Sequence, residues 1–203
     1  MKTKISINQF NLNKKKMKNF KITTLALVAL LALSSCSKDD TPLVNEEEVI
    51  TTVTAVFTPQ GGGTPITLQY KDLDGDGPNA PLTIPPSGNF AQNTTYDGAV
   101  TILNETESPA GDITSEVKAE GEEHQLFFQA PSAVGTFVYN DADANGKPIG
   151  LKFTLTTKNA ATGDLVVTLR HLPNKSAPGV ADGEITNAGG ATDFAVTYPV
   201  VVQ

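Results

Sequence analysis

The fold is decided by residues 49–58, which read VITTVTAVFT. Apolar and β-branched residues alternate with polar ones along this stretch, which is the period of a β-strand with one buried face. The stretch ends at Pro59-Gln60-Gly61-Gly62-Gly63, a combination typical of a turn, and a second alternating segment follows at 65–70. The sequence therefore predicts that the domain begins with antiparallel strands.

Six further segments downstream have the same alternating, β-branched character, and Gly, Pro, Asn and Asp separate them. The only helical candidate is 112–120, which Asp112 or Ser108 would cap. Many short strands joined by such turns predict an all-β fold, an Ig-like antiparallel β-sandwich. The predicted strands are 49–58, 65–70, 96–103, 125–130, 135–139, 151–157, 164–169 and 194–202.

Two parts of the chain, about 48–107 and 122–176, resemble one another. Residues 70–77 read YKDLDGDG and residues 139–146 read YNDADANG, and each follows a predicted strand. Similar segments lie upstream and downstream in the same order. The sequence therefore predicts two tandem four-strand repeats plus a C-terminal strand. Because four strands alone bury little apolar surface, we expect the two halves to form one sandwich.

The residues before the first strand are typical of an export signal. Translation is expected to start at Met17, after which Lys18 and Lys21 precede the apolar run 22–33. This run is shorter than the roughly 20 residues that a membrane-spanning helix needs, and it fits a cleaved secretory signal. The alternatives are a buried helix or a short membrane anchor. We expect residues 1–35 to be removed as a signal peptide.

Leu33-Ser34-Ser35-Cys36 resembles the bacterial lipobox, in which the cysteine is lipidated and becomes the mature N-terminus. Cys36 is the only cysteine, so an internal disulfide cannot form. Two or more acyl chains, palmitate among them, would hold the protein stably on a membrane. The organisation that follows is a lipidated, flexible tether at 36–47 and a β-sandwich domain at 48–203.

The residues after the cysteine bear on location. Ser37 in the second mature position favours outer-membrane sorting, by analogy with enteric lipoproteins. Lys38, Asp39 and Asp40 resemble the surface-export signal of Bacteroidota lipoproteins, although an ordinary charged tether would have the same composition. We expect a lipid-anchored outer-membrane protein, with the cell surface favoured over the periplasmic face.

The charge of the mature chain excludes one class of partner. Residues 1–35 hold seven of the 15 basic residues and none of the 22 acidic ones, which leaves 8 against 22 and a formal net charge of −14. Such a charge repels nucleic-acid phosphates. The expected partners are the membrane, through the lipid, and outer-membrane proteins.

Acidic residues at alternate positions make the two similar loops candidates for Ca²⁺, which prefers six to eight oxygen ligands. Neither loop is an EF-hand, because Thr83 and Lys152 stand where the bidentate Glu would be needed. The alternative is that Asp, Asn and Gly serve only as turn residues. The candidate ligands are Asp72, Asp74 and Asp76 in the first loop and Asp141, Asp143 and Asn145 in the second.

No nucleophile elbow, phosphate-binding loop or dinucleotide fingerprint occurs in the sequence, so we expect no enzymatic activity. His124 and His171, the only histidines, have no second His or Cys at a ligand spacing. We expect both to be structural residues at strand ends.

From about residue 46 onward the chain resembles a family of lipoproteins from flavobacteria and other Bacteroidota. The resembling segments are GGGTP at 61–65, DLDGD at 72–76, LNET at 103–106, EEHQ at 122–125 and NDADANG at 140–146. Some members of the family carry the label "type 1 periplasmic binding fold". That label implies an α/β fold, and this sequence lacks the helices for it.

Two functions are consistent with these features. The first is a non-catalytic, surface-exposed outer-membrane lipoprotein that acts as a binding or interaction module. The alternative is a periplasmic solute- or metal-binding lipoprotein with calcium-type acidic loops.

Overall fold

The computed structural model describes residues 48–74 and 81–203. This part of the chain is mostly β, with nine strands, one α-helix and two 3-10 helices. The strands are β1 (Thr52–Pro59), β2 (Ile66–Lys71), β3 (Leu82–Ile84), β4 (Thr95–Leu103), β5 (His124–Gln129), β6 (Gly135–Tyr139), β7 (Lys152–Thr157), β8 (Ala161–His171) and β9 (Ala191–Val202), and the helices are α2 (Ile113–Ala119), η1 (Val180–Asp182) and η2 (Ile185–Asn187). All eight predicted strands are confirmed, and β3 is the strand that the prediction missed.

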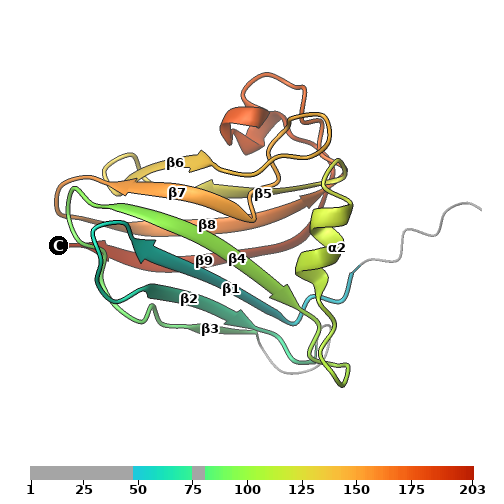
Figure 1. Cartoon of the computed structure of the whole chain (residues 1–203), viewed down its shortest axis with the longest axis horizontal. Helices are drawn as coiled ribbons and strands as arrows, with labels where there is room; N and C mark the ends of the chain where they lie inside the picture. The colour runs from blue at the N-terminus through green and yellow to red at the C-terminus, as the bar shows by residue number, and fades with distance from the viewer. Residues whose placement is uncertain (1–47, 75–80) are drawn as a thin grey trace, which may run out of the picture. The chain divides into compact units, whose positions relative to one another are not determined.

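The strands form two antiparallel sheets, as predicted for a sandwich (Figure 1). The larger sheet has the order β3-β2-β1-β4-β7-β6, and the smaller has the order β5-β8-β9. Residues of both sheets belong to one buried cluster, which includes Phe57 of β1, Phe153 of β7 and Tyr198 of β9. The two layers therefore share a single hydrophobic core.

Alternation of buried and exposed side chains explains why these segments are strands. Along β9, every second residue from Phe194 to Val202 is buried, and the residues between them are at least partly exposed. Phe57 packs edge-on against Phe90 and Phe153, with ring centroids 5.1 and 5.4 Å apart. Burying each such aromatic side chain contributes about 1.5–3 kcal/mol, so this aromatic group is a major part of the core.

The structure does not confirm the two tandem four-strand repeats. Strands β1 to β4 all lie in the larger sheet, whereas of β5 to β8 only β6 and β7 lie there, and β5 and β8 join β9 in the smaller sheet. The pair β1–β4 corresponds to β5–β8, and the pair β2–β3 corresponds to β6–β7. However, β1 bonds to β2, while β5 and β6 are in different sheets. The likeness of the two halves therefore extends to strand pairs and not to the whole unit.

Helix α2 covers one end of the sandwich, where β4 ends (Figure 1). Asp112 caps the helix by accepting a hydrogen bond from the Ser115 amide, as predicted. The Thr114 hydroxyl accepts from the Ile102 amide and donates to the Ile102 carbonyl. It therefore satisfies the edge of β4 opposite β1, beyond Ala99, where the pairing with β7 ends. The turn after the helix, 120–123, leads directly into β5 and positions the site described below.

Within the described residues, no helix has the length and apolar character needed to cross a bilayer. Several sequence predictions concern residues that lie outside the described part of the chain. They are the signal peptide, Cys36, Ser37, Lys38, Asp39, Asp40 and the candidate ligand Asp76.

Candidate metal centre

Two histidines far apart in the sequence face each other at the edge of the smaller sheet. His124 is the first residue of β5 and His171 the last residue of β8, so the prediction that both lie at strand ends is confirmed. They are direct partners in the antiparallel pair, and their rings stack with centroids 4.7 Å apart and planes 10° apart. His124 is 1% exposed and His171 is 7% exposed. The sequence prediction missed this pairing, because neither residue has a ligand partner nearby in the chain.

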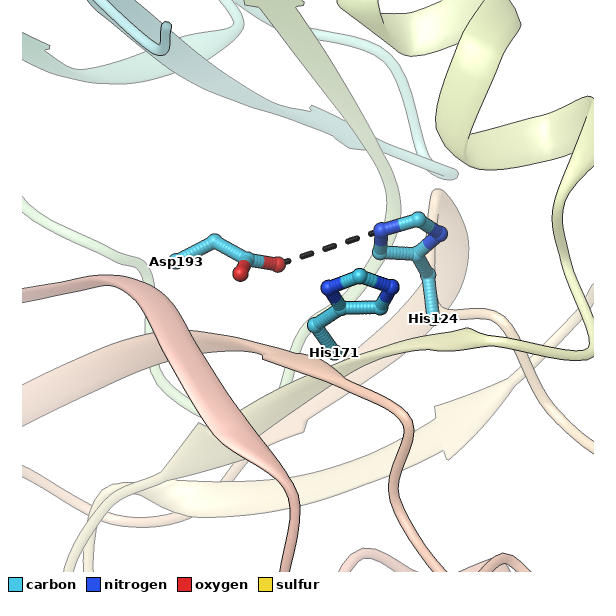
Figure 2. Close-up of side chains that lie close together, drawn as sticks. All are labelled: His124, His171 and Asp193. Carbon is cyan, nitrogen blue, oxygen red and sulfur yellow. Dashed lines mark ion pairs between the residues drawn. The ribbon is translucent and has the colours of Figure 1, made fainter. Parts of the chain in front are cut away.

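A β-bulge brings Asp193 to the same place. On β9, Phe194 pairs with Leu169 and Thr192 pairs with Arg170, so Asp193 is an extra residue between them. A bulge re-aims a side chain that regular alternation would direct to the other face. The Asp193 carboxylate lies at the edge of the two imidazole rings (Figure 2), with Oδ2 3.9 Å from His124 Nε2.

A second carboxylate reaches His124 from the segment that leads into β1. Glu48 Oε1 lies 3.6 Å from His124 Nε2, and the Glu48 side chain is 15% exposed. Glu48 Oε2 is buried and has no hydrogen-bond partner in the described part of the chain. His124 Nε2 is thus close to the oxygens of two acidic residues, at distances longer than a hydrogen bond.

The other ring nitrogen fixes which atom of His124 is free to bind a cation. Nδ1 lies 3.3 Å from the Glu120 carbonyl oxygen, which can only accept, so Nδ1 carries the proton. Burial lowers the pKa of His124, which favours the neutral ring. A neutral ring protonated at Nδ1 has its lone pair on Nε2, directed at the two carboxylates. Histidines that bind metals commonly donate their other N–H to a carbonyl in this way.

The described residues contain two groups of possible metal ligands, which share His124. Within each group, one ligand atom from each residue lies within 4.8 Å of the others. One is His124, His171 and Asp193, and the other is Glu48, Glu120 and His124. Because the two rings are stacked, their lone pairs run nearly parallel, and one ion could be shared only after a rotation of the His171 ring. The terminal torsion of histidine is broad, but this rotation would break the stacking of a ring that is only 7% exposed. His171 Nε2 also lies 3.7 Å from Glu123 Oε2, whose side chain is 54% exposed.

Burial, followed by the neighbouring carboxylate of Asp193, raises the pKa of Glu48 from its ordinary value of 4.5 to about 7. Between these two values the folded protein holds a proton that the unfolded chain has lost. In the absence of metal, the contribution of Glu48 to the free energy of unfolding therefore falls as pH rises from about 4.5 to about 7.

Glu48→Gln should remove this dependence, because glutamine is neutral throughout. We compare the free energy of unfolding of the variant with that of wild type at each pH. As pH rises from 5 to 8, this difference should change in favour of the variant by on the order of 2 kcal/mol. Urea denaturation in the presence of a chelator measures the difference at each pH. A difference that stays constant with pH would contradict the assignment to Glu48.

The carboxylates of the second acidic loop are used by the chain's own donors. Asp141 accepts hydrogen bonds from the amides of Gly150 and Lys152, at 2.8 and 3.0 Å. Asp143 accepts from the amides of Asn145 and Lys147, both at 2.9 Å. These bonds contribute to the order of the loop.

A buried ammonium contacts one of the three candidate calcium ligands of this loop, Asp143. Lys175 Nζ contacts Asp143 Oδ2 at 3.0 Å and the Pro148 carbonyl at 2.8 Å, and it also donates to the Gly121 carbonyl. Lys175 is 6% exposed. It therefore fastens the second loop to the turn between α2 and β5.

The first acidic loop is described only in part. Asp72 Oδ2 accepts a hydrogen bond from the Tyr70 hydroxyl at 3.3 Å, while Asp74 is exposed. Burial, together with the adjacent Asp72, raises the pKa of Tyr70. The calcium hypothesis for Asp72, Asp74 and Asp76 remains a prediction.

A cavity of about 800 Å³ lies beside the histidine pair, between the end of α2 and the second acidic loop. Its apolar wall includes Val100, Ile149 and Leu151, and Lys118 and Lys152 supply positive charge. Glu120 and Glu123, which contact the two histidines, also line it. The metal-ligand group and the cavity thus share the turn that precedes β5.

Comparison with known proteins gives the chain no relative: it matches no family model, no curated protein and no solved structure.

Proposed function

We propose that the chain is a non-catalytic, lipid-anchored binding protein of the outer membrane whose ligand is a divalent transition-metal ion. The ion would be held by His124, His171 and Asp193. One observation carries the proposal: Nε2 of the buried His124 lies 3.6 and 3.9 Å from the carboxylate oxygens of Glu48 and Asp193, beside a second imidazole.

The chemistry of this ligand set selects the class of metal. Imidazole nitrogen suits Zn²⁺, Cu²⁺, Ni²⁺ and Fe²⁺, whereas Ca²⁺ prefers a shell made only of oxygen. A divalent ion would also neutralise acidic groups that are costly to bury together. The ligand proposed for this centre is therefore different from the Ca²⁺ that the acidic loops suggested.

Calorimetric titration of the full-length protein, after removal of metal with a chelator, tests the proposal. We expect Zn²⁺ to bind with a stoichiometry of one per chain and a Kd in the micromolar range or tighter. Ca²⁺ should not displace it. Absence of Zn²⁺ binding up to millimolar concentration would refute the metal-binding function.

The cavity supports a second candidate, capture of a small solute. Its volume of about 800 Å³ lies within the range of roughly 300–1,000 Å³ that is usual for ligand sites. It combines an apolar wall with charged residues of both signs. A ligand screen by thermal shift, compared between wild type and Leu151→Trp, which would fill the cavity, separates solute binding from metal binding.

The proposed location rests on the sequence alone, on the lipobox-like segment that ends at Cys36 and on the Lys38-Asp39-Asp40 segment. We expect protease treatment of intact cells to degrade the protein, because the domain would face the medium. Replacement of Lys38, Asp39 and Asp40 by alanine should leave the protein membrane-anchored but protected. Equal protection of wild type and variant would instead place the protein on the periplasmic face.

A further inference from the structure

The residues of the candidate metal centre come from both layers of the sandwich. His124, His171 and Asp193 belong to the smaller sheet, on β5, β8 and β9. Glu48 precedes β1, a central strand of the larger sheet. Its carboxylate nevertheless lies 3.6 Å from His124 Nε2. An ion bound between these residues would contact both sheets at once.

We propose that Glu48 is the fourth protein ligand of the ion, which thereby cross-links the two sheets at this end of the sandwich. This inference rests on the metal centre proposed above. It adds a ligand residue from another part of the chain and assigns the ion a structural role. Two imidazoles and two carboxylates would supply four ligands of the types that bind zinc, which is the number of ligands in a structural zinc site.

The distances to His124 support this assignment. With metal–ligand bonds of about 2.0–2.2 Å, two ligand atoms of a tetrahedral zinc ion lie about 3.4 Å apart. Glu48 Oε1 and Asp193 Oδ2 lie 3.6 and 3.9 Å from His124 Nε2, so each is within about half an ångström of that spacing. Glu48 does not belong to the group in which the ligand atoms of His124, His171 and Asp193 lie within 4.8 Å of one another, so the bound ion would have to draw the Glu48 carboxylate towards those two residues.

The surroundings of Glu48 indicate that its present contacts are incomplete. Its oxygen Oε2 is buried without a hydrogen-bond partner in the described residues. A bound cation would give this carboxylate the partner that the buried oxygen lacks.

A metal cross-link also suits the composition of this chain. Its single cysteine, Cys36, cannot form an intrachain disulfide, so no covalent bridge can join the two layers. A bound metal can supply such a constraint, because its binding free energy becomes folding free energy.

The test compares Zn²⁺ binding by full-length wild type, Glu48→Gln and Glu122→Gln. Glu122 is exposed and lies two residues before His124, so its variant makes the same chemical change outside the centre. We expect Glu48→Gln to lower the affinity for Zn²⁺ at least about tenfold and to lose about half or more of the rise in Tm that saturating Zn²⁺ produces. Glu122→Gln should behave as wild type.

Hydrogen exchange distinguishes a ligand role of Glu48 from a purely electrostatic one. Only direct binding of the ion by Glu48 should make Zn²⁺ slow the exchange of the neighbouring amides. In wild type, Zn²⁺ should slow exchange of the amides of residues 49–52 as well as those next to His124 and His171. In Glu48→Gln, only the latter should be slowed. Glu48→His, which offers a ligand nitrogen, should restore both the affinity and the slowing at 49–52.

The outcomes separate the two proposals. If wild type binds no Zn²⁺, the metal-binding function itself is refuted. If wild type binds Zn²⁺ and Glu48→Gln binds it with equal affinity and equal slowing at 49–52, the metal centre stands and the cross-link by Glu48 is overturned.

Discussion

His171→Ala is expected to lower the affinity of the protein for Zn²⁺ by more than about a hundredfold, because it removes one of only two nitrogen ligands. The rest of the centre should remain in place. His124 stays oriented by the Glu120 carbonyl, and Asp193 stays positioned by the bulge in β9. The loss should therefore be one of metal affinity and not of folding.

Asp164→Asn is the matched control for this variant. Asp164 is exposed on the same strand, β8, and pairs with Pro199, away from the centre. Its replacement removes a carboxylate without touching a proposed ligand, so Zn²⁺ affinity should not change. Competition against a chromophoric chelator measures both variants. Equal affinity of His171→Ala and wild type would exclude His171 from the ligand set.

Lys175→Met is expected to lower the free energy of unfolding by about 3–5 kcal/mol, the usual cost of removing one partner of a buried ion pair. The Asp143 carboxylate and the carbonyls of Gly121 and Pro148 would all lose their contact with the ammonium. Burial lowers the pKa of Lys175, and Asp143 opposes that shift, which indicates that the charged form depends on its partner.

Two further variants make this stability prediction specific. Lys158→Met removes an exposed lysine at the end of β7 and should change stability by less than about 0.5 kcal/mol. Adding Asp143→Asn to Lys175→Met should recover part of the loss, because the unpaired carboxylate is then absent. Urea denaturation of the four proteins provides the comparison. A loss below about 1 kcal/mol for Lys175→Met would mean that the buried ammonium does not hold the second loop.

The strands could be predicted because their residues alternate in a locally visible pattern. In 96–103 and 194–202, for example, buried and exposed positions follow the period of two that the sequence displays. Strand β3 (Leu82–Ile84) was missed because it is only three residues long and none of its side chains is buried. A strand that buries nothing leaves no alternation to detect.

The candidate metal centre could not be predicted from spacing, because its proposed ligands come from four separate segments. The pairing of β5 with β8 brings the start of one strand beside the end of the other, and with them His124 and His171. A usable signal was present: each histidine stands at the boundary of a predicted strand. Combining these boundaries would have required the strand order, which the sequence does not display.

Asp193 shows a second limit of sequence patterns. Because Phe194 is a core residue, alternation directs Asp193 to the opposite face of β9. The bulge opposite Leu169 and Arg170 reverses this expectation. The second acidic loop shows a third limit. Its spacing resembles a calcium loop, and the sequence does not display that Lys175, which is distant in the chain, contacts Asp143 there.

X-ray absorption at the zinc edge of the stoichiometric Zn²⁺ complex tests the central proposal most directly. We predict a first shell of nitrogen and oxygen at about 2.0–2.2 Å, with the outer-shell scattering of two imidazole rings and no sulfur. An all-oxygen shell without imidazole would place the ion at the acidic loops instead. A sulfur atom at about 2.3 Å would place it at Cys36. Either result would contradict a metal centre at His124, His171 and Asp193.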